Sequence, residues 1–294
     1  MRFTRFKAAA AVMALAGSLA ACGSDDDGGS DPEVVEDAEF EAGTTMAELS
    51  EQGSMTVGTK FDQPGFGLQG LDDAPEGFDV EVAKIIAGAM GISEDNITWE
   101  ETPSDIREQV IEDGTVDMVV ATYTINEERA QRITFAGPYY NAGQMLMVLS
   151  DNDAINGPDD LAANPDAKVC SVTGSTPSEQ IKEYLASDDQ LVLFDVYDKC
   201  ADALSNGQVD VVTTDNVILA GFVSESDGEF KLVGEQFTEE PYGIGIEKGD
   251  VAFCEFINQT LQDNQDAYVE AWESTAGQVE GAETPELPEP APCS

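Results

Sequence analysis

The sequence predicts an α/β protein built of two similar lobes, each a mostly parallel sheet flanked by helices. Short buried strands alternate with amphipathic helices along the chain, and the alternation runs through two successive series of about 100 residues each. With 294 residues, 41% of them hydrophobic, the chain is long enough to bury two cores rather than one.

The first series begins at residue 55. Its clearest helix is "FDVEVAKIIAGAM" at 78–90, where apolar residues recur at helical spacing. The other expected elements are strands at 55–60, 97–102 and 116–123 and a helix at 107–113. This βαβαβ order is typical of a mostly parallel sheet covered by helices.

The second series follows residue 149 and then gives way to a strand that returns to the first sheet. Its expected elements are strands at 167–172, 191–196 and 209–215, helices at 177–186, 197–207 and 216–224, a return strand at 242–250 and helices at 251–261 and 267–275. We therefore expect residues 46–149 plus 241–294 to form the first lobe and 150–240 the second. The proline-rich end, 283–294, is expected to be extended.

The N-terminus has the three parts of a lipoprotein signal. Three bases, Arg2, Arg5 and Lys7, precede an apolar run that is too short for a membrane span, and "LAAC" at 19–22 resembles a lipobox. We expect a signal peptide at 1–21, lipidation of Cys22, and an acidic flexible tether at 22–45 that holds the protein outside the cell membrane. An ordinary signal with a chance cysteine is the alternative.

The charge balance excludes several classes of function. The chain carries 59 acidic and 13 basic residues, a net charge of −46, which argues against nucleic acid as a partner. Histidine is absent, which removes the common general acid–base group, the usual catalytic triads and most zinc sites. We expect no enzyme activity, no cofactor and no metal.

The five cysteines indicate disulfides. If Cys22 is lipidated, four remain in an oxidising compartment, and an even number there favours pairing. Three pairings are possible. We expect Cys170–Cys200 and Cys254–Cys293, the pairs nearest in sequence.

Polar residues that could bind a ligand follow a strand in the first lobe. "VDMVVATYT" runs a buried strand into a turn, which places Thr122, Thr124 and Arg129 near the carboxyl end of that strand. Open α/β sheets bind ligands at this edge, and the guanidinium fork of Arg129 suits a carboxylate. The alternative is that "EERAQR" at 127–132 is a solvated, ion-paired turn.

The second lobe offers two further candidates. "TGSTPSEQ" at 173–180 reads as a capping box from Thr176 to Glu179 with Pro177 at the first helical position, and exposed amides there would bind an anion. A simple cap is the alternative. Asp215 ends a strand, where it would either cap the next helix or hold an ammonium group. The glycine run at 65–70 matches a dinucleotide fingerprint but does not open into a helix, so we set it aside.

Taken together, these segments resemble a known family. "GFDVEVAKIIAGAMGI", "DMVVATYTINEERAQRITFAGPYY", "VTGST" and "VDVVTTD" resemble the polar amino-acid class of ABC-importer substrate-binding proteins over roughly residues 50–275. The resemblance implies a periplasmic-binding-protein-like (type II) fold with a ligand cleft between the lobes, a core shared with ionotropic glutamate receptors. "GTKFDQPGFG" and the lipobox are most similar to glutamate-binding lipoproteins of Gram-positive bacteria.

The resemblance also implies roles for individual residues. Arg129 would bind the ligand α-carboxylate with help from Thr124, Ser175 and Thr176, and Asp215 would bind the α-ammonium with an oxygen of Thr122. Lys60 lies where the family contacts the ligand side chain, so a lysine points to glutamate or aspartate; a solvated surface lysine is the alternative. Gln63 stands where some relatives have a stacking aromatic ring. Phe61 or Phe66 could take its place, so the stacking partner stays open.

The implied function is capture of an amino acid, with glutamate favoured over aspartate, glutamine and asparagine. The lobes would close on the ligand and a monomer would deliver it to a permease and an ATPase, neither of which this chain contains. Two alternatives stay open: a sensor subunit that signals through a partner, and a dehydratase or lyase on the same fold, in which Asp215 would have to act as the acid–base group.

Overall fold

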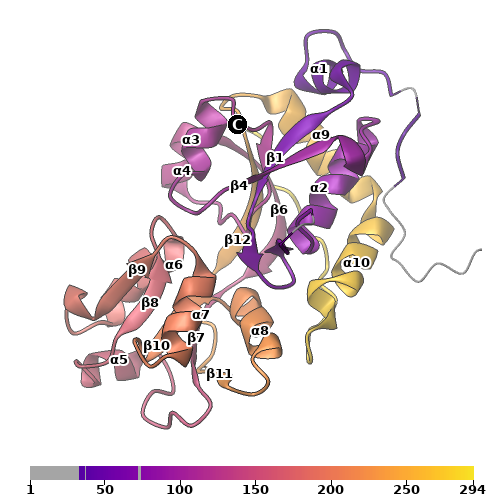
Figure 1. Ribbon diagram of the computed structural model, residues 1–294. Helices are drawn as coiled ribbons and strands as arrows, with labels where there is room; N and C mark the ends of the chain where they lie inside the picture. Colours follow the sequence, from indigo (N-terminus) through magenta and orange to yellow (C-terminus); the bar gives the residue numbers. More distant parts are fainter. Residues whose placement is uncertain (1–32, 37, 72–73) are drawn as a thin grey trace, which may run out of the picture. The chain divides into compact units, whose positions relative to one another are not determined.

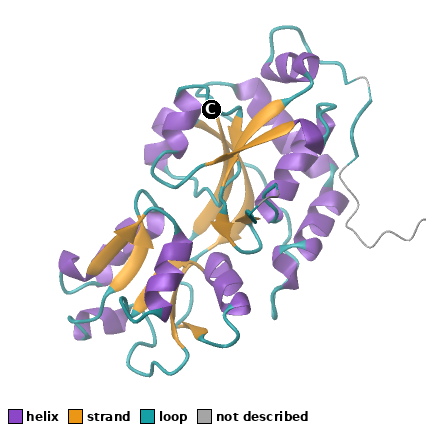
Figure 2. Cartoon of the chain, viewed as in Figure 1, coloured by secondary structure: helices purple, strands orange, loops and turns teal. Residues whose placement is uncertain are grey.

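This computed structural model describes residues 33–36, 38–71 and 74–294. The described residues form one compact unit in which helices cover two five-stranded sheets (Figure 1; Figure 2). The signal peptide expected at 1–21, Cys22 and the start of the expected tether lie outside the described residues. Within the described part, every helix is too short or too polar to cross a membrane.

The first sheet has the strand order β4-β1-β5-β12-β6 and forms, with its helices, what we call lobe 1. Its strands are β1 (Met55–Thr59), β4 (Ile97–Glu101), β5 (Met118–Val119), β6 (Thr134–Ala142) and β12 (Glu240–Ile246). β1 pairs in parallel with β4 and β5, whereas β12 is antiparallel to both β5 and β6. The expected mostly parallel sheet is therefore mixed, because β12 returns from the second lobe at the edge where β6 leaves and must run the opposite way.

Helices cover both faces of this sheet. They are α1 (Thr45–Gln52), α2 (Phe78–Ala89), α3 (Arg107–Glu112), α4 (Glu127–Arg132), α9 (Val251–Asp263) and α10 (Gln265–Ser274), with short 3-10 turns η1 (Glu94–Asn96) and η4 (Ala276–Gln278). Rings of Phe78, Tyr268 and Trp272 join α2 and α10 in the larger core. The smaller core beneath α3 holds Ile111 and Ile133. The glycine run at 65–70 falls in and after a hairpin of β2 (Asp62–Gln63) and β3 (Gly67–Leu68), not at a helix start.

The second sheet has the order β11-β7-β10-β8-β9 and forms lobe 2 with its helices. Its strands are β7 (Gln144–Leu149), β8 (Val169–Val172), β9 (Leu191–Phe194), β10 (Val211–Asp215) and β11 (Phe230–Val233). Its helices are α5 (Asp159–Ala163), α6 (Thr176–Gln180), α7 (Tyr197–Ser205) and α8 (Asn216–Glu225). Two 3-10 turns, η2 (Ile181–Tyr184) and η3 (Asp188–Gln190), complete the lobe. Side chains of β7 alternate between the two cores: Met147 packs with α7 and α8, and Leu146 and Val148 pack with α5. This alternation is what a strand covered on both faces requires.

The chain crosses between the lobes twice, and the two crossings touch. The first crossing is at Gly143, where a Cβ would lie 2.6 Å from the carbonyl oxygen of Thr238 in the second crossing. The amide of Gln144 also donates to Thr238 Oγ1 at 2.9 Å. The expected boundary after residue 149 is wrong, since β7 belongs to lobe 2. No turn signal other than Gly143 separates β6 from β7, so the pattern could not show the change of sheet.

The described residues between 33 and 44, which leave out residue 37, contact lobe 1, although we expected a flexible tether as far as residue 45. The amide of Val35 donates to the carbonyl of Gly88 at 2.9 Å, and the ring of Phe40 meets that of Phe256 edge-on at 5.4 Å. An acidic composition does not reveal these few anchoring apolar residues. The ordered body therefore begins earlier than predicted.

Both expected disulfides are present in the structure. Cys170 in β8 is bonded to Cys200 in α7, with Cα atoms 5.6 Å apart. Cys254 in α9 is bonded to Cys293, with Cα atoms 5.9 Å apart. The second bond holds the extended C-terminal segment on lobe 1, where the amide of Ala291 also donates to Gly137.

Candidate functional site between the lobes

The predicted site residues lie at the carboxyl ends of strands from both sheets. Lys60 directly follows β1, and Asp215 ends β10. The other predicted residues follow β5 or β8: Thr122, Thr124 and Arg129 in lobe 1, and Ser175 and Thr176 in lobe 2. All are buried except Thr176, which is half-buried.

Arg129 joins the two lobes. Asn126 caps α4 by accepting the amide of Arg129, which fixes the helix start. Its guanidinium donates to the carbonyl of Thr124 at 2.8 Å and to that of Gly174, in lobe 2, at 2.9 Å, and Nε lies 3.2 Å from Glu108 Oε1. Burial lowers the pKa of Arg129 to about 10, so the group stays charged at neutral pH.

The second arginine of the segment behaves differently. Arg132 lies on the exposed side of α4 and pairs with Glu112, Nε to Oε1 at 2.8 Å. The alternative of a solvated ion-paired turn is therefore right for Arg132 and wrong for Arg129.

Lys60 is buried, so the alternative of a solvated surface lysine is wrong. The residue is 1% exposed, and Nζ donates to Ser104 Oγ at 3.0 Å. Burial, only partly offset by the nearby Asp62, lowers the pKa of Lys60 to about 8. Among the described residues, the ammonium group has one hydrogen-bond partner, the hydroxyl of Ser104, and lies 6.0 Å from the ring centre of Tyr197.

Asp215 precedes α8 but its side chain does not cap that helix. Instead Oδ2 accepts the hydroxyl of Tyr242 at 2.7 Å, and the buried Oδ1 has no hydrogen-bond partner in the described part of the chain. Burial and the nearby Glu240 raise the pKa of Asp215 to about 7. A buried carboxylate oxygen with no partner is the acceptor that an ammonium group would satisfy.

The start of α6 differs by one residue from the predicted capping box. Ser175, not Thr176, is the N-cap: its Oγ accepts the amide of Ser178 at 3.1 Å, and Pro177 is the second helical residue. Ser175 rather than Thr176 caps the helix because the Ser175 hydroxyl accepts the amide of the third helical residue, Ser178. Thr176 Oγ1 is buried and has no partner among the described residues.

Thr122 has an unusual backbone. Its φ is 44°, in the left-handed region, and its amide donates to a carboxylate oxygen of Asp79 at 2.7 Å. Its hydroxyl lies 3.0 Å from Gln63 Oε1 and 2.8 Å from the carbonyl of Ala121. Gln63 Nε2 is buried without a partner among the described residues. At the position where some relatives have a stacking aromatic ring, this protein therefore offers a hydrogen-bond donor.

Two residues near the site were missed by the sequence reasoning. Arg107 is buried beneath it, with Nη1 donating to Ala121 at 2.7 Å and the guanidinium 4.2 Å from the ring centre of Tyr123. Asp62 reaches across to lobe 2, where Oδ2 accepts the amide of Tyr197 at 2.6 Å. Nothing in "REQVIED" sets Arg107 apart from a solvated helix residue, and Asp62 has no periodicity signal.

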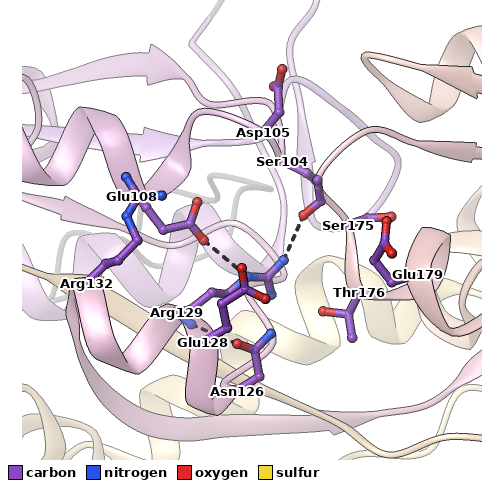
Figure 3. Close-up of a pocket in the computed structure, with 11 residues that line it drawn as sticks. Ser104, Asp105, Glu108, Asn126, Glu128, Arg129, Arg132, Ser175, Thr176 and Glu179 are labelled. Carbon is purple, nitrogen blue, oxygen red and sulfur yellow. Dashed lines mark hydrogen bonds and ion pairs between the residues drawn. The ribbon is translucent and has the colours of Figure 1, made fainter.

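A cavity of about 550 Å³ opens beside Arg129, between the lobes. Figure 3 shows the Arg129 guanidinium at its centre, with Glu108 on one side and Ser175, Thr176 and Glu179 of lobe 2 on the other. Its lining residues are Ser104, Asp105, Glu108, Asn126, Glu128, Arg129, Arg132, Gly174, Ser175, Thr176 and Glu179. The volume is that of a small-molecule site. Lys60, Thr122, Thr124 and Asp215 do not line this cavity.

Two α/β lobes joined by paired crossings, with oppositely charged buried groups where they meet, define a periplasmic-binding-protein-like fold, and the predicted two-lobed type II fold is confirmed. The structure is similar to that of an ancestral arginine-binding protein bound to glutamine, with a TM-score of 0.70, 33% identity, and coverage of 77% of this chain and 99% of that chain.

Sequence comparison leads to the same family. The family model of the bacterial extracellular solute-binding proteins, family 3, matches residues 55–269. The glutamate-binding protein GluB of Corynebacterium efficiens is 41% identical over 272 residues, 88% of this chain and 86% of that protein. The ABC transporter glutamine-binding protein GlnH of Bacillus subtilis is 36% identical over 245 residues, 83% of this chain and 86% of that protein. The chain belongs to the bacterial extracellular solute-binding proteins, family 3.

Proposed function

We propose that this protein captures a polar amino acid, glutamate above all, between its lobes and delivers it to a membrane permease of an ABC importer. The observation that carries the proposal is the pair of buried, oppositely charged groups, Arg129 in lobe 1 and Asp215 in lobe 2. A zwitterion needs both charges, and each is buried deeply enough to interact strongly with a ligand.

Arg129 would bind the α-carboxylate. A guanidinium has five N–H donors, and the contacts of Arg129 use one on each nitrogen, so one N–H on each Nη is left for a ligand. Thr124, and Ser175 and Thr176, which line the cavity from lobe 2, would add hydrogen bonds. The Ser175 amide would have to give up a long bond to the carbonyl of Val172, 3.3 Å in this structure. Two parallel bonds from one guanidinium are the geometry that favours a carboxylate.

Asp215 would bind the α-ammonium, assisted by an oxygen of Thr122. Its unpartnered Oδ1 supports this role, and Tyr242 holds the other oxygen in place. An ammonium beside the carboxylate would lower the raised pKa of Asp215 and keep it ionised.

Lys60 supports glutamate as the preferred ligand. A buried ammonium with one hydroxyl partner favours a ligand that brings a second carboxylate. The similarity to a glutamate-binding protein at 41% identity supports the same choice, whereas the glutamine-binding relative at 36% makes glutamine the main competitor.

Location and partners belong to the same proposal. The family is extracellular, and we propose that Cys22 carries a lipid anchor and that the closed form of a monomer docks on the permease. The relatives reported above are binding proteins, which supports binding without conversion of the ligand.

A thermal-shift screen of the mature protein against the twenty amino acids tests the proposal, followed by calorimetry on the best ligands. We expect the largest shift from glutamate and a micromolar dissociation constant, about −8 kcal/mol. No shift with any amino acid would overturn the function. A larger shift with glutamine would overturn the choice of glutamate alone.

A further inference from the structure

Asp79 is a fully buried acid that no ligand role uses. It lies in the first turn of α2, where acidic residues are ordinarily solvated, yet its exposure is 0%. Oδ2 accepts the amide of Thr122 at 2.7 Å, and Oδ1 accepts the hydroxyl of Tyr139 at 2.5 Å. The carbonyl of Tyr139 in turn accepts the hydroxyl of Tyr268 at 2.8 Å. The carboxylate is therefore fixed from two sides.

The backbone that Asp79 contacts is strained. A φ of 44° is uncommon for any residue with a Cβ and unfavourable for a β-branched one such as Thr122. Such conformations persist only where the surroundings hold them, and they gather at ligand-binding sites. Among the described residues, the hydroxyl of Thr122 reaches Ala121 and Gln63, both in lobe 1, and its carbonyl accepts from Arg107 Nη1 at a long 3.5 Å. The bond that directly fixes the amide is the one it donates to Asp79.

We propose that Asp79 is a positioning residue that holds Thr122 in its left-handed conformation, so that the oxygens of Thr122 are in place for the ligand ammonium. The inference rests on the proposed function for the ligand, but the effect on the Thr122 backbone does not. Burial raises the pKa of Asp79 to about 7, so its ionised form prevails only above that pH. The ionised form suits this task best, because hydrogen bonds to a charged group are about twice as strong as neutral ones. Tyr139 keeps that acceptor from rotating away.

Calorimetry of a small set of variants tests the proposal. Asp79→Ala removes the acceptor, so Thr122 would relax and would have to return to its strained conformation when glutamate binds. We expect binding to weaken by about tenfold, the factor that corresponds to 1.4 kcal/mol. Asp79→Asn keeps a neutral acceptor of the same shape, and we expect most of the affinity to return. In a Thr122→Gly background, where glycine adopts positive φ without support, the additional loss caused by Asp79→Ala should fall to about twofold.

Asp117→Ala is the matched control. Asp117 Oδ2 also accepts a backbone amide at 2.7 Å, that of Thr56, but at the opposite end of β1 from Lys60. We expect this variant to lower the melting temperature and to leave the glutamate dissociation constant within about twofold, since it touches no cleft residue. An Asp79→Ala variant that behaves like Asp117→Ala, less stable but with unchanged affinity, would reduce Asp79 to a structural role. Equal losses from Asp79→Ala with and without the Thr122→Gly substitution would do the same.

A readout without ligand separates this inference from the proposed function. Hydrogen exchange should show the Thr122 amide strongly protected in the wild-type protein and faster by about tenfold in Tyr139→Phe, which removes the donor to Asp79 and keeps the ring. A crystal structure of Asp79→Ala should show Thr122 at negative φ. If Thr122 keeps its positive φ and its amide protection in both variants, the positioning role is wrong even where glutamate binds. If φ and protection change but no amino acid binds to the wild-type protein, only the proposed function fails.

Discussion

Replacement of Lys60 by methionine should separate glutamate from glutamine. The two side chains have similar length, so the change removes the charge and leaves the packing nearly intact. A carboxylate that takes the place of Ser104 Oγ, 3.0 Å from Nζ, would interact with the ammonium by about 5.5 kcal/mol at an effective dielectric constant of 20. Desolvation of both groups offsets part of this, and a hydrogen bond to a charged group retains about 1.5–3 kcal/mol.

Calorimetry measures this prediction. We expect Lys60→Met to weaken glutamate binding by about 10- to 150-fold and glutamine binding by only a few-fold. Lys84→Met, which removes the same charge from a half-buried site on α2, controls for the change in net charge. Equal losses for glutamate and glutamine would refute the assignment of Lys60 to the ligand side chain.

The pH dependence gives a second measure of the same interaction. The pKa of Lys60 without ligand is about 8, and a bound carboxylate raises it, so the contribution to affinity is complete below pH 8 and declines above it. The ratio of glutamate to glutamine affinity should fall by up to about tenfold per pH unit above 8. A ratio that stays constant from pH 6 to about 9 would contradict this reasoning.

Three other substitutions or conditions test the remaining parts of the site. Arg129→Ala should cost about 2–5 kcal/mol of binding free energy, because it leaves the buried α-carboxylate of the ligand unpaired. Arg132→Ala, on the exposed side of the same helix, is the control and should change the dissociation constant less than about twofold. The pKa of Asp215 is about 7 without ligand, and its ionised form binds the ammonium, so affinity for glutamate and glutamine alike should decline as pH falls below 7. Asp62→Ala removes the bond that lobe 1 makes to the Tyr197 amide of lobe 2, and small-angle scattering with saturating ligand should show a smaller fraction of closed protein; an unchanged scattering curve would count against that role.

The elements with strong periodicity were predictable from the sequence. The helix at 78–90 and the strand at 55–60 match α2 and β1 to within a residue, because both have clear apolar faces. The segment 134–149 was not assigned, since Gly137, Pro138 and Gly143 interrupt it, yet it forms β6 and β7. The pairing of β6 with β12 in the first sheet depends on contacts between residues about 100 positions apart, which local patterns do not contain.

The site was predictable where a family motif marked it and not elsewhere. The motif pointed to Arg129 and Asp215, and the structure places both buried beside the junction of the lobes. Asp79 was assigned to a helix and nothing more, because an acid in a first turn looks the same whether it is solvated or bonded to a distant strand. Arg107 was missed for the same reason: its partners, Ala121 and Tyr123, are brought to it by the fold.

The contact between Gly143 and Thr238 has a consequence for protein engineering. Because the chain leaves the first sheet and comes back to it at neighbouring points, with Ala142 paired to Glu240, residues 144–239 are in effect one cassette inserted into a host. Two adjacent junctions suffice to exchange that cassette for its counterpart from a relative. Such chimaeras would combine lobe 1 of this protein, which carries Lys60, with lobe 2 of a relative in place of the lobe that carries Asp215. Ligand preference would then change without disturbing the core of either lobe.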